Sequence, residues 1–521
     1  MVTTLRLFLV LILATLLPAC ATLRTDVPRE PSHALAPDPG TPLGRIAGRL
    51  VTSEDASSFR LLESGRSALA ARLALIHYAT RTLDLQYYLF KIDISGQVVV
   101  DALLKAADRG VRVRLLLDDI DTAANEQVII ALDTHKNVQV RLYNPFRVRG
   151  NAPLGRAFEF LGDKGRLNRR MHNKLFLADN HFGITGGRNI GDEYFQVEHE
   201  VTFRDLDVMA AGKLVRDMSK SFDAYWNSAH SVPARAIPYP GKRRQLLAEQ
   251  RAALDAYRAE VQPLMENFLD LDALRDPKES GLGPWTAGRG ELVDDPPDKT
   301  EGAVVPRELP VARLMRMVRD ARDDVLISSP YFVPKEKGAE FFADIARKGV
   351  SVRILTNSLA ANDVSVVHAG YARYRRPLLA AGVELYELKP SKERPGMRVL
   401  TSRGSSRASL HTKAMVVDKA QVYVGSMNLD PRSAWLNTET GLLVHCPDLA
   451  GQVSRFIEAS MTPEQSYRVL IDPDSDGEEG RLVWLDKKGD KVARHTEEPR
   501  TNMFSRLLIR LLGAFPIEDE L

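Results

Sequence analysis

Short apolar runs with the alternation of β-strands recur along the chain in two groups of three. They lie at 81–90, 111–119 and 138–146 in the first half, and at 323–332, 350–358 and 382–388 in the second. Between the first two runs of each group, apolar residues recur with helical spacing, and each predicted helix stops at a glycine, Gly110 or Gly349. This alternation of strands and helices indicates α/β layers with a largely parallel central sheet.

The same order of elements appears in both halves, which indicates two similar domains. We expect the first domain at 61–240 and the second at 286–521, with a charged helical linker at 241–285 between them. The length of 521 residues allows each domain its own core. The predicted fold class is therefore α/β, with two similar lobes.

The N-terminus has the pattern of a signal segment. Arg6 precedes an apolar run over 7–17, which is short for a membrane span, and Leu-Pro-Ala-Cys ends at Cys20. The segment 1–20 resembles a bacterial lipoprotein signal, in which Cys20 is lipidated; an uncleaved anchor helix is the alternative. Pro-rich residues follow and predict a flexible tether over 21–60. Either interpretation places the protein at a membrane of the cell envelope, facing the periplasm, without choosing the inner or the outer membrane.

Composition excludes little else. Acidic and basic residues nearly cancel, to a net charge of +3, so no nucleic acid partner is indicated. The chain has two cysteines, which excludes a disulfide framework and a cysteine zinc site. The second of them, Cys446, follows an apolar run and is expected to be a buried small hydrophobe.

One polar pattern is written twice, each time after the third strand of a group. His is followed by Lys two residues later, by Asp five residues after the Lys, and by Asn ten residues after the Asp. On a strand, the His and Lys of one copy point to the same side. The first copy consists of His172, Lys174, Asp179 and Asn189, and the second of His411, Lys413, Asp418 and Asn428.

If the two halves pack around a pseudo-two-fold axis, both copies converge on one pocket. Lysine and asparagine side chains stabilise the charge that grows on phosphate oxygens in a transition state. One histidine can attack phosphorus, and the other can protonate the leaving alcohol. A metal site is the alternative, but a lysine between the ligands would repel a cation, and no HExxH or paired cysteines occur. We therefore predict phosphodiester chemistry without a metal or another cofactor.

These motifs, HNKLFLADNHFGITGGRN and HTKAMVVDKAQVYVGSMN, resemble the HKD repeats of the phospholipase D superfamily. The stretches LDLQYYLF, ISSPYFVP and SMNLDPRSAWLNTETGLLV are similar to its bacterial cardiolipin synthase branch, and most to the cardiolipin synthase C type. The resemblance implies two phospholipase D-like lobes with the site between them. It also implies a phosphatidyltransferase that forms cardiolipin from phosphatidylglycerol and a second phospholipid, such as phosphatidylethanolamine. A phospholipase D that releases phosphatidic acid is the alternative, and a nuclease is a weaker one.

Carried over by position, the resemblance makes His172 or His411 the nucleophile, with His172 the usual assignment, and makes the lysines and asparagines phosphate ligands. It also implies a carboxylate that supports each histidine: Glu439 for one, and Asp207 for the other, although Glu200 keeps the spacing from Asn better. Asp179 and Asp418 fall in turns and are expected to be structural. Ser426 matches a small residue lining the site, where the first copy has Gly187.

Two further segments have open interpretations. His368 and Asn362, with Arg373, Arg375 and Arg376, could bind the acceptor headgroup, or they could belong to a loop and a solvated surface helix. The segment 501–515 has the pattern of an amphipathic helix, which favours packing against the body over contact with lipid. The expected partners are membrane phospholipids and the membrane surface; no protein partner is indicated.

Overall fold

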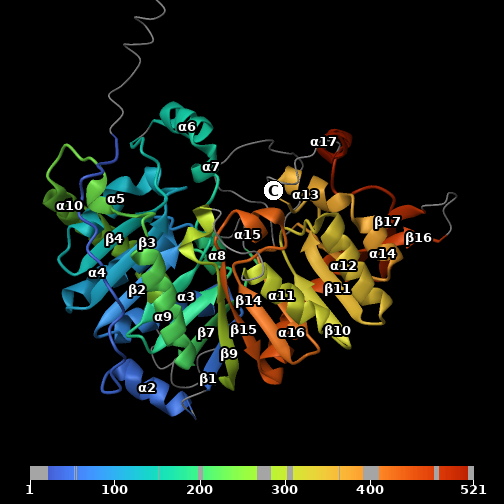
Figure 1. Cartoon of the computed structure of the whole chain (residues 1–521), viewed down its shortest axis with the longest axis horizontal. Coiled ribbons are helices and arrows are strands. Elements are labelled where there is room, and N and C mark those ends of the chain that lie inside the picture. The colour runs from blue at the N-terminus through green and yellow to red at the C-terminus, as the bar shows by residue number, and fades with distance from the viewer. Residues whose placement is uncertain are drawn as a thin grey trace, which may run out of the picture.

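The protein folds into two lobes that lie side by side, one coloured blue to green and the other yellow to red (Figure 1). The computed structural model describes residues 22–51, 53, 56–150, 152–197, 203–266, 283–301, 309–362, 364–390, 410–473 and 480–513. Each lobe has a sheet with helices on its outer face, and further helices lie between the two sheets. The sequence-based assignment to the α/β class is confirmed.

The first lobe has three parallel strands at its centre: β2 (Thr82–Tyr87), β3 (Arg112–Asp118) and β4 (Val138–Tyr143). Antiparallel strands extend this sheet on both sides in the order β8-β4-β3-β2-β5-β6-β7-β1. The added strands are β8 (Ser231–Pro233), β5 (Leu175–Ala178), β6 (Phe182–Gly186), β7 (Asp207–Gly212) and β1 (Ser57–Leu62).

The second lobe repeats this arrangement. Its parallel centre is β10 (Asp324–Ser328), β11 (Ser351–Asn357) and β12 (Glu384–Leu388). Antiparallel strands again flank the centre, in the order β15-β14-β13-β10-β11-β12-β16-β17-β18. The added strands are β13 (Ala414–Val417), β14 (Gln421–Gly425), β15 (Thr440–His445), β16 (Ser466–Asp472), β17 (Arg481–Lys488) and β18 (Lys491–His495).

Strand β9 (Thr286–Asp294) joins the two sheets. Its first residues pair with β1, and its later residues pair with β15. Between the sheets, α9 (Lys213–Trp226) and α16 (Pro447–Met461) contribute buried apolar side chains to a core that both lobes share. Burial of this shared apolar surface fixes the two lobes against each other, because the hydrophobic effect scales with the area removed from water.

The remaining helices cover the outer faces and the edges of the sheets. On the first lobe these are α2 (Pro42–Leu50), α3 (Gly65–Tyr78), α4 (Ile94–Asp108), α5 (Glu126–Asp133), α6 (Pro153–Gly162), α7 (Lys164–Leu167), α8 (Asp192–Phe195) and α10 (Arg243–Glu266). On the second lobe they are α11 (Pro310–Arg319), α12 (Lys335–Arg347), α13 (Ser365–Ala372), α14 (Arg375–Ala380), α15 (Pro431–Trp435) and α17 (Met503–Gly513). None of the helices in the described ranges is long and apolar enough to cross a membrane.

Two sequence-based expectations need correction. The sheets are less parallel than expected, because each motif forms a tight hairpin, β5–β6 or β13–β14, and a tight hairpin joins strands in antiparallel order. The stretch 21–60 is also not a flexible tether over its described residues. The backbone N–H of Ser32 donates to the side chain of Asn227, just after α9, at 3.0 Å, and that of Ala34 donates to Asp223 of α9 at 2.7 Å. A helix forms at α2, and β1 lies inside the sheet.

Candidate active site

The Asp of each motif begins a two-residue turn between the two strands of a hairpin. Asp179 and Asn180 have φ of 50° and 54°, and Asp418 and Lys419 have φ of 52° and 51°. Two successive left-handed residues are typical of the tight turns that match the twist of a hairpin. The Asp179 carboxylate accepts hydrogen bonds from the backbone N–H groups of Arg81 and Thr82 at 2.8 Å and 2.9 Å. These contacts support the structural role expected for the Asp.

Asp418 makes the same contacts in the second lobe. Its carboxylate accepts from the backbone N–H groups of Arg322, Asp323 and Asp324 at distances between 2.8 Å and 3.2 Å. Each Asp therefore ties its hairpin to the start of the neighbouring central strand, β2 in the first lobe and β10 in the second.

The His and Lys of each motif lie just before the hairpin, on the same side of the chain. The Lys174 ammonium donates to the backbone carbonyl of His172 at 2.7 Å, and Lys413 donates to the carbonyl of His411 at the same distance. Lys174 also lies 5.6 Å from the centre of the Tyr88 ring, and that ring packs at a steep angle to His172 with 4.9 Å between the ring centres. Tyr88 directly follows β2, so this part of the site lies at the carboxyl ends of the central parallel strands.

Each histidine is held by the opposite lobe. The backbone N–H of His172 donates to the carbonyl of Thr438, and its Nδ1 lies 2.8 Å from Oε2 of Glu439. In the equivalent arrangement of the other histidine, the backbone N–H of His411 donates to the carbonyl of Arg204, and its Nδ1 lies 2.6 Å from Oδ2 of Asp205. A carboxylate at Nδ1 fixes the tautomer in which Nε2 is unprotonated and able to act as a base or nucleophile.

Burial governs the charges of these groups. Desolvation lowers the pKa of His172 to about 4, and the pKa of His411 falls well below its ordinary value because of burial and of the neighbouring Lys413 and Lys174. Both imidazoles are therefore neutral at pH 7 in the ligand-free site. Burial, reinforced by Lys413, also lowers the pKa of Lys174 to about 7. An anion entering between these groups would stabilise their charged forms.

The two supporting carboxylates are not equivalent. Burial raises the pKa of Asp205 to about 6, whereas the pKa of Glu439 is lowered overall, because the neighbouring His172 and Lys174 outweigh its burial. The Ser426 hydroxyl donates to Oε2 of Glu439 and accepts from the backbone N–H of Thr440 at 3.0 Å. The environments of the two histidines therefore differ, as an acid and a nucleophile require.

The first lobe has no counterpart of the Ser426 hydroxyl. A Cβ atom at Gly187 would lie 2.1 Å from Oδ1 of Asp205, so the carboxylate occupies the space that a side chain would need. Ser426 is fully buried beneath Glu439 rather than lining an open surface. Gly187 therefore leaves room for the Asp205 carboxylate, whereas Ser426 donates a hydrogen bond to the Glu439 carboxylate.

The expectation that Asp207 supports His411 is wrong. Asp207 is buried against the guanidinium group of Arg72 at 2.9 Å, and the carboxylate at His411 is Asp205. Glu200, the alternative, lies outside the described residues. Asp205 follows Asn189 by 16 positions, but Glu439 follows Asn428 by only 11, so counting forward from the Asn misplaces the carboxylate.

A signal for Asp205 does exist in the strand register. Asp207 pairs with Gly186, and Gly441 pairs with Gly425 at the equivalent place in the second lobe. Glu439 lies two residues before Gly441, and Asp205 lies two residues before Asp207. Counting back from the strand therefore finds both carboxylates, because the longer connection in the first lobe lies before the strand.

The two asparagines are buried but have different partners. Asn189 accepts from the backbone N–H of Leu89 at 3.1 Å and donates to the Tyr194 hydroxyl at 2.9 Å. Oδ1 of Asn428 has no hydrogen-bond partner among the described residues. Because the unused Oδ1 of Asn428 is an acceptor, only the Nδ2 donors of the two amides can bind phosphate oxygens, and which of them does so stays a prediction.

The structure argues against His368 and Arg375 as ligands of an acceptor headgroup. Nε2 of His368 lies 3.2 Å from Glu498 and 2.8 Å from Arg375. Arg375 is buried and contacts Glu387 and Glu498 at 2.8 Å and 2.6 Å. Two other expected ligands already have partners in the protein: Asn362 accepts from the backbone N–H of Val364, and Arg376 donates to the carbonyl of Gly480. A buried charge cluster therefore accounts for His368 and Arg375, which the sequence suggested as ligands of the acceptor headgroup.

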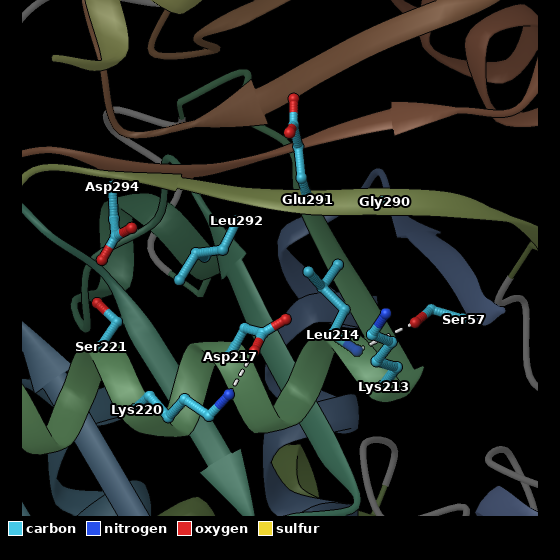
Figure 2. Close-up of a pocket in the computed structure, with 10 residues that line it drawn as sticks. All are labelled: Ser57, Lys213, Leu214, Asp217, Lys220, Ser221, Gly290, Glu291, Leu292 and Asp294. Atoms are coloured by element: carbon cyan, nitrogen blue, oxygen red, sulfur yellow. Dashed lines mark hydrogen bonds and ion pairs between the residues drawn. The ribbon is translucent and has the colours of Figure 1, made fainter. Parts of the chain in front are cut away.

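A cavity of about 560 Å³ lies away from the motifs, between α9 and β9 (Figure 2). Its lining carries charges of both signs, and Lys220 pairs with Asp217 at 3.0 Å. No motif residue lines it. Across the described ranges, no group of three or more His, Cys, Asp or Glu side chains is placed to hold a metal ion.

Comparison with known proteins agrees with the duplicated geometry. The family described as cardiolipin synthase, PLD-like domain, matches residues 73–226 and 314–461, one match in each lobe. The chain belongs to the PLD-like cardiolipin synthase family. This membership confirms the resemblance that the HKD motifs suggested.

Named relatives and a solved structure extend the comparison. Cardiolipin synthase C of Escherichia coli is 40% identical over 88% of this chain and 94% of its own length. A cardiolipin synthase of Geobacillus sp. is 26% identical over 80% of this chain and 69% of its own. The crystal structure of phosphatidylserine synthase from Haemophilus influenzae covers 92% of this chain and all of that one, with a TM-score of 0.57 and 14% identity, and shows the same fold.

Proposed function

We propose that this member of the cardiolipin synthase family is a phosphatidyltransferase that forms cardiolipin from phosphatidylglycerol and a second phospholipid. The observation that carries the proposal is the crossed pairing of His172 with Glu439 and of His411 with Asp205. It provides two neutral imidazoles of unlike environment beside two lysines, which suits attack on one phosphodiester. The named relatives, which are cardiolipin synthases, support the choice of substrate.

In the first step, Nε2 of His172 attacks the phosphorus of the donor lipid. The bond from phosphorus to the headgroup oxygen breaks, and His411 gives that oxygen a proton, which leaves the phosphatidyl group on His172. The phosphodiester's negative charge raises the pKa of His411, which lets it carry the proton at neutral pH. Lys174 and Lys413 stabilise the charge on the non-bridging oxygens.

In the second step, His411 takes the proton of an acceptor hydroxyl while that oxygen attacks phosphorus. The bond to His172 breaks, and the new phosphodiester leaves. Glu439 favours His172 as the nucleophile, because its lowered pKa keeps it ionised, and an ionised carboxylate stabilises the positive charge that the ring gains during attack. His411, with Asp205 beside it, then has the role of acid and base.

Water could open the same intermediate, which would make the protein a phospholipase D. Effective molarities of well-oriented groups reach about 10⁵ M or more, so a bound acceptor outcompetes water despite the abundance of water. The test is to incubate the purified protein with phosphatidylglycerol, with and without phosphatidylethanolamine, and to count the products. Cardiolipin as the main product supports the transferase; phosphatidic acid at every acceptor concentration would establish the hydrolase.

The proposal also places the protein at a membrane of the cell envelope, facing the periplasm, through a lipid on Cys20. Cys20 follows the apolar run of the signal-like segment, and both lie outside the described residues. A lipid substrate and a lipid anchor are mutually consistent, because an anchored enzyme meets its substrate in the plane of the membrane. Membrane phospholipids are then its partners, and nothing in its near-neutral charge favours a nucleic acid.

A further inference from the structure

Helix α6 has its apolar and polar faces reversed. Leu154, Phe158 and Leu161 are spaced four and three residues apart, so they share one helix face, and each is more than 70% exposed. The polar residues of α6 face the protein: Glu159 accepts from the backbone N–H groups of Arg147 and Val148 at 2.8 Å and 2.9 Å. A surface helix ordinarily turns its apolar face to the core, so this arrangement needs an apolar partner outside the described fold.

Helix α17 presents a second apolar surface. Its Ser505 and Ile509 are buried, and Ile509 packs with Leu359 and with Ala369 of α13. The opposite side is exposed, with relative exposures from 51% to 78%, and consists of Met503, Phe504, Leu507 and Leu511. The expected packing of this helix against the body thus accounts for one of its faces only.

Both helices lie at the edge of the sheets that carries the histidines. Helix α6 follows the carboxyl end of β4, and α13, on which α17 packs, follows the carboxyl end of β11. The site lies at the carboxyl ends of the same parallel sets, because Tyr88 at the end of β2 contacts His172. Figure 1 shows α6 and α17 at the top of the molecule, each over a different lobe, with α15 lower down near the middle.

The start of the described chain leads to the same place. Thr22 forms an antiparallel bridge with Val148, and Leu23 donates to the carbonyl of Arg147 at 2.7 Å. Arg147 and Val148 are also the two residues whose backbone N–H groups donate to Glu159 of α6. Thr22 is thus held close to α6, and Cys20 precedes it by two positions in the sequence.

We propose that the exposed apolar faces of α6 and α17 dock on a phospholipid bilayer and hold the histidine edge of both sheets toward it. The proposal rests on the proposed function, because a lipid substrate has to reach this edge from a bilayer. Helices that place large apolar side chains in a membrane interface gain the free energy of burying them. The start of the described chain favours a bilayer over a second copy, since a lipid on Cys20, two positions before Thr22, would hold this end of the chain at a membrane.

The test uses the full-length chain, with cysteine introduced at Phe158→Cys on α6 or Leu507→Cys on α17. The matched control is Lys348→Cys, at the exposed end of α12, where the chain enters the opposite edge of the sheet. Each variant is labelled with a nitrobenzoxadiazole probe and mixed with vesicles of phosphatidylglycerol and phosphatidylethanolamine. Cys446 is buried, and the unsubstituted chain labelled in the same way gives the background.

Probes at positions 158 and 507 should shift to shorter wavelength on vesicles and be quenched by spin-labelled lipid, whereas the probe at 348 should not change. Equal exposure to water at all three positions would overturn the proposal. So would a shift without vesicles that grows with protein concentration, which would assign the surface to a second copy. These signals need no turnover, so failure to make cardiolipin would refute the proposed function and leave the docking result standing.

A second pair of measurements connects docking to turnover. Phe158→Gln combined with Leu161→Gln should lower product formation from vesicles and leave the turnover of a dissolved short-chain phosphatidylglycerol unchanged. Equal losses on both substrates would contradict docking, because they would indicate damage to the fold or to the site itself.

Discussion

Nδ1 of His172 lies 2.8 Å from Oε2 of Glu439, a residue 267 positions further along the chain and in the other lobe. The reciprocal contact joins His411 to Asp205 across 206 positions. Each lobe therefore supplies a histidine for which the other lobe supplies the carboxylate. The pairing explains why the motif occurs twice in one chain, since a single copy would leave its histidine without this support.

Asp205→Asn should reduce the rate of transfer by a factor on the order of 10² or more, because an amide holds His411 in the wrong tautomer for a proton carrier. The fold should persist, since the substitution keeps the side chain's shape. The initial rate of cardiolipin formation and the thermal unfolding midpoint, measured on the same preparation, check both parts.

Glu200→Gln is the matched comparison, because the spacing from Asn189 favours Glu200. It should retain much more activity than Asp205→Asn. The reverse ranking would show that Glu200 supports His411 and that the contact of Asp205 has no catalytic role.

Gly187→Ser and Ser426→Gly form a reciprocal pair across the two lobes. A side chain at position 187 meets the Asp205 carboxylate, so Gly187→Ser should lower activity strongly. Ser426→Gly removes only one donor to Glu439 and should lower activity less. Rates of cardiolipin formation measured for the two variants side by side test this ranking. Full activity of Gly187→Ser would contradict it, because it would show that the Asp205 carboxylate can move without loss of activity.

Binding of an anion should draw a proton from solution at pH 8. Lys174 has a pKa of about 7 in the ligand-free site, so it is mostly neutral at pH 8. A bound sulfate raises this pKa, and the lysine then takes up a proton. Calorimetric titration with sulfate in buffers of different ionisation enthalpy measures the uptake, with Lys174→Arg as a control that stays charged throughout. Identical heats for the unsubstituted chain in all buffers would refute the prediction.

Much of the fold could be predicted from the sequence. The six central strands follow from apolar runs of strand length, and α4 and α12 follow from helical spacing that ends before Gly110 and Gly349. The antiparallel strands were harder, because their direction depends on the hairpin turns rather than on their apolar pattern. The joining role of β9 depends on pairing with both β1 and β15, which local sequence does not encode.

The active-site residues likewise include some that the sequence predicts and some that it does not. The histidines and lysines could be found from sequence because their spacing is local and repeated. Asp205 could not be found by that spacing, because the connection before it is longer in the first lobe. His368 and Arg375 were misinterpreted for a related reason: Glu498, which pairs with both of them, comes from a distant part of the chain.

The anchor has its own prediction. Radiolabelled palmitate supplied to cells should enter the unsubstituted protein and be absent from Cys20→Ser, because a lipidated cysteine is the expected mature N-terminus. Fractionation gives a second readout, since two or more acyl chains make release from the membrane slow. Unlabelled protein in the soluble periplasmic fraction would contradict lipidation.

The central claim is that two unlike histidines share one phosphodiester, with His172 as the nucleophile. It is tested most directly by trapping the intermediate from a phosphatidyl ester labelled at phosphorus, with p-nitrophenol as a leaving group that needs no acid. His411→Ala should accumulate label on His172 as an acid-labile, base-stable adduct, because no base remains to activate the acceptor. His172→Ala should form no adduct. Label on the His172→Ala protein, or none on His411→Ala, would contradict the account.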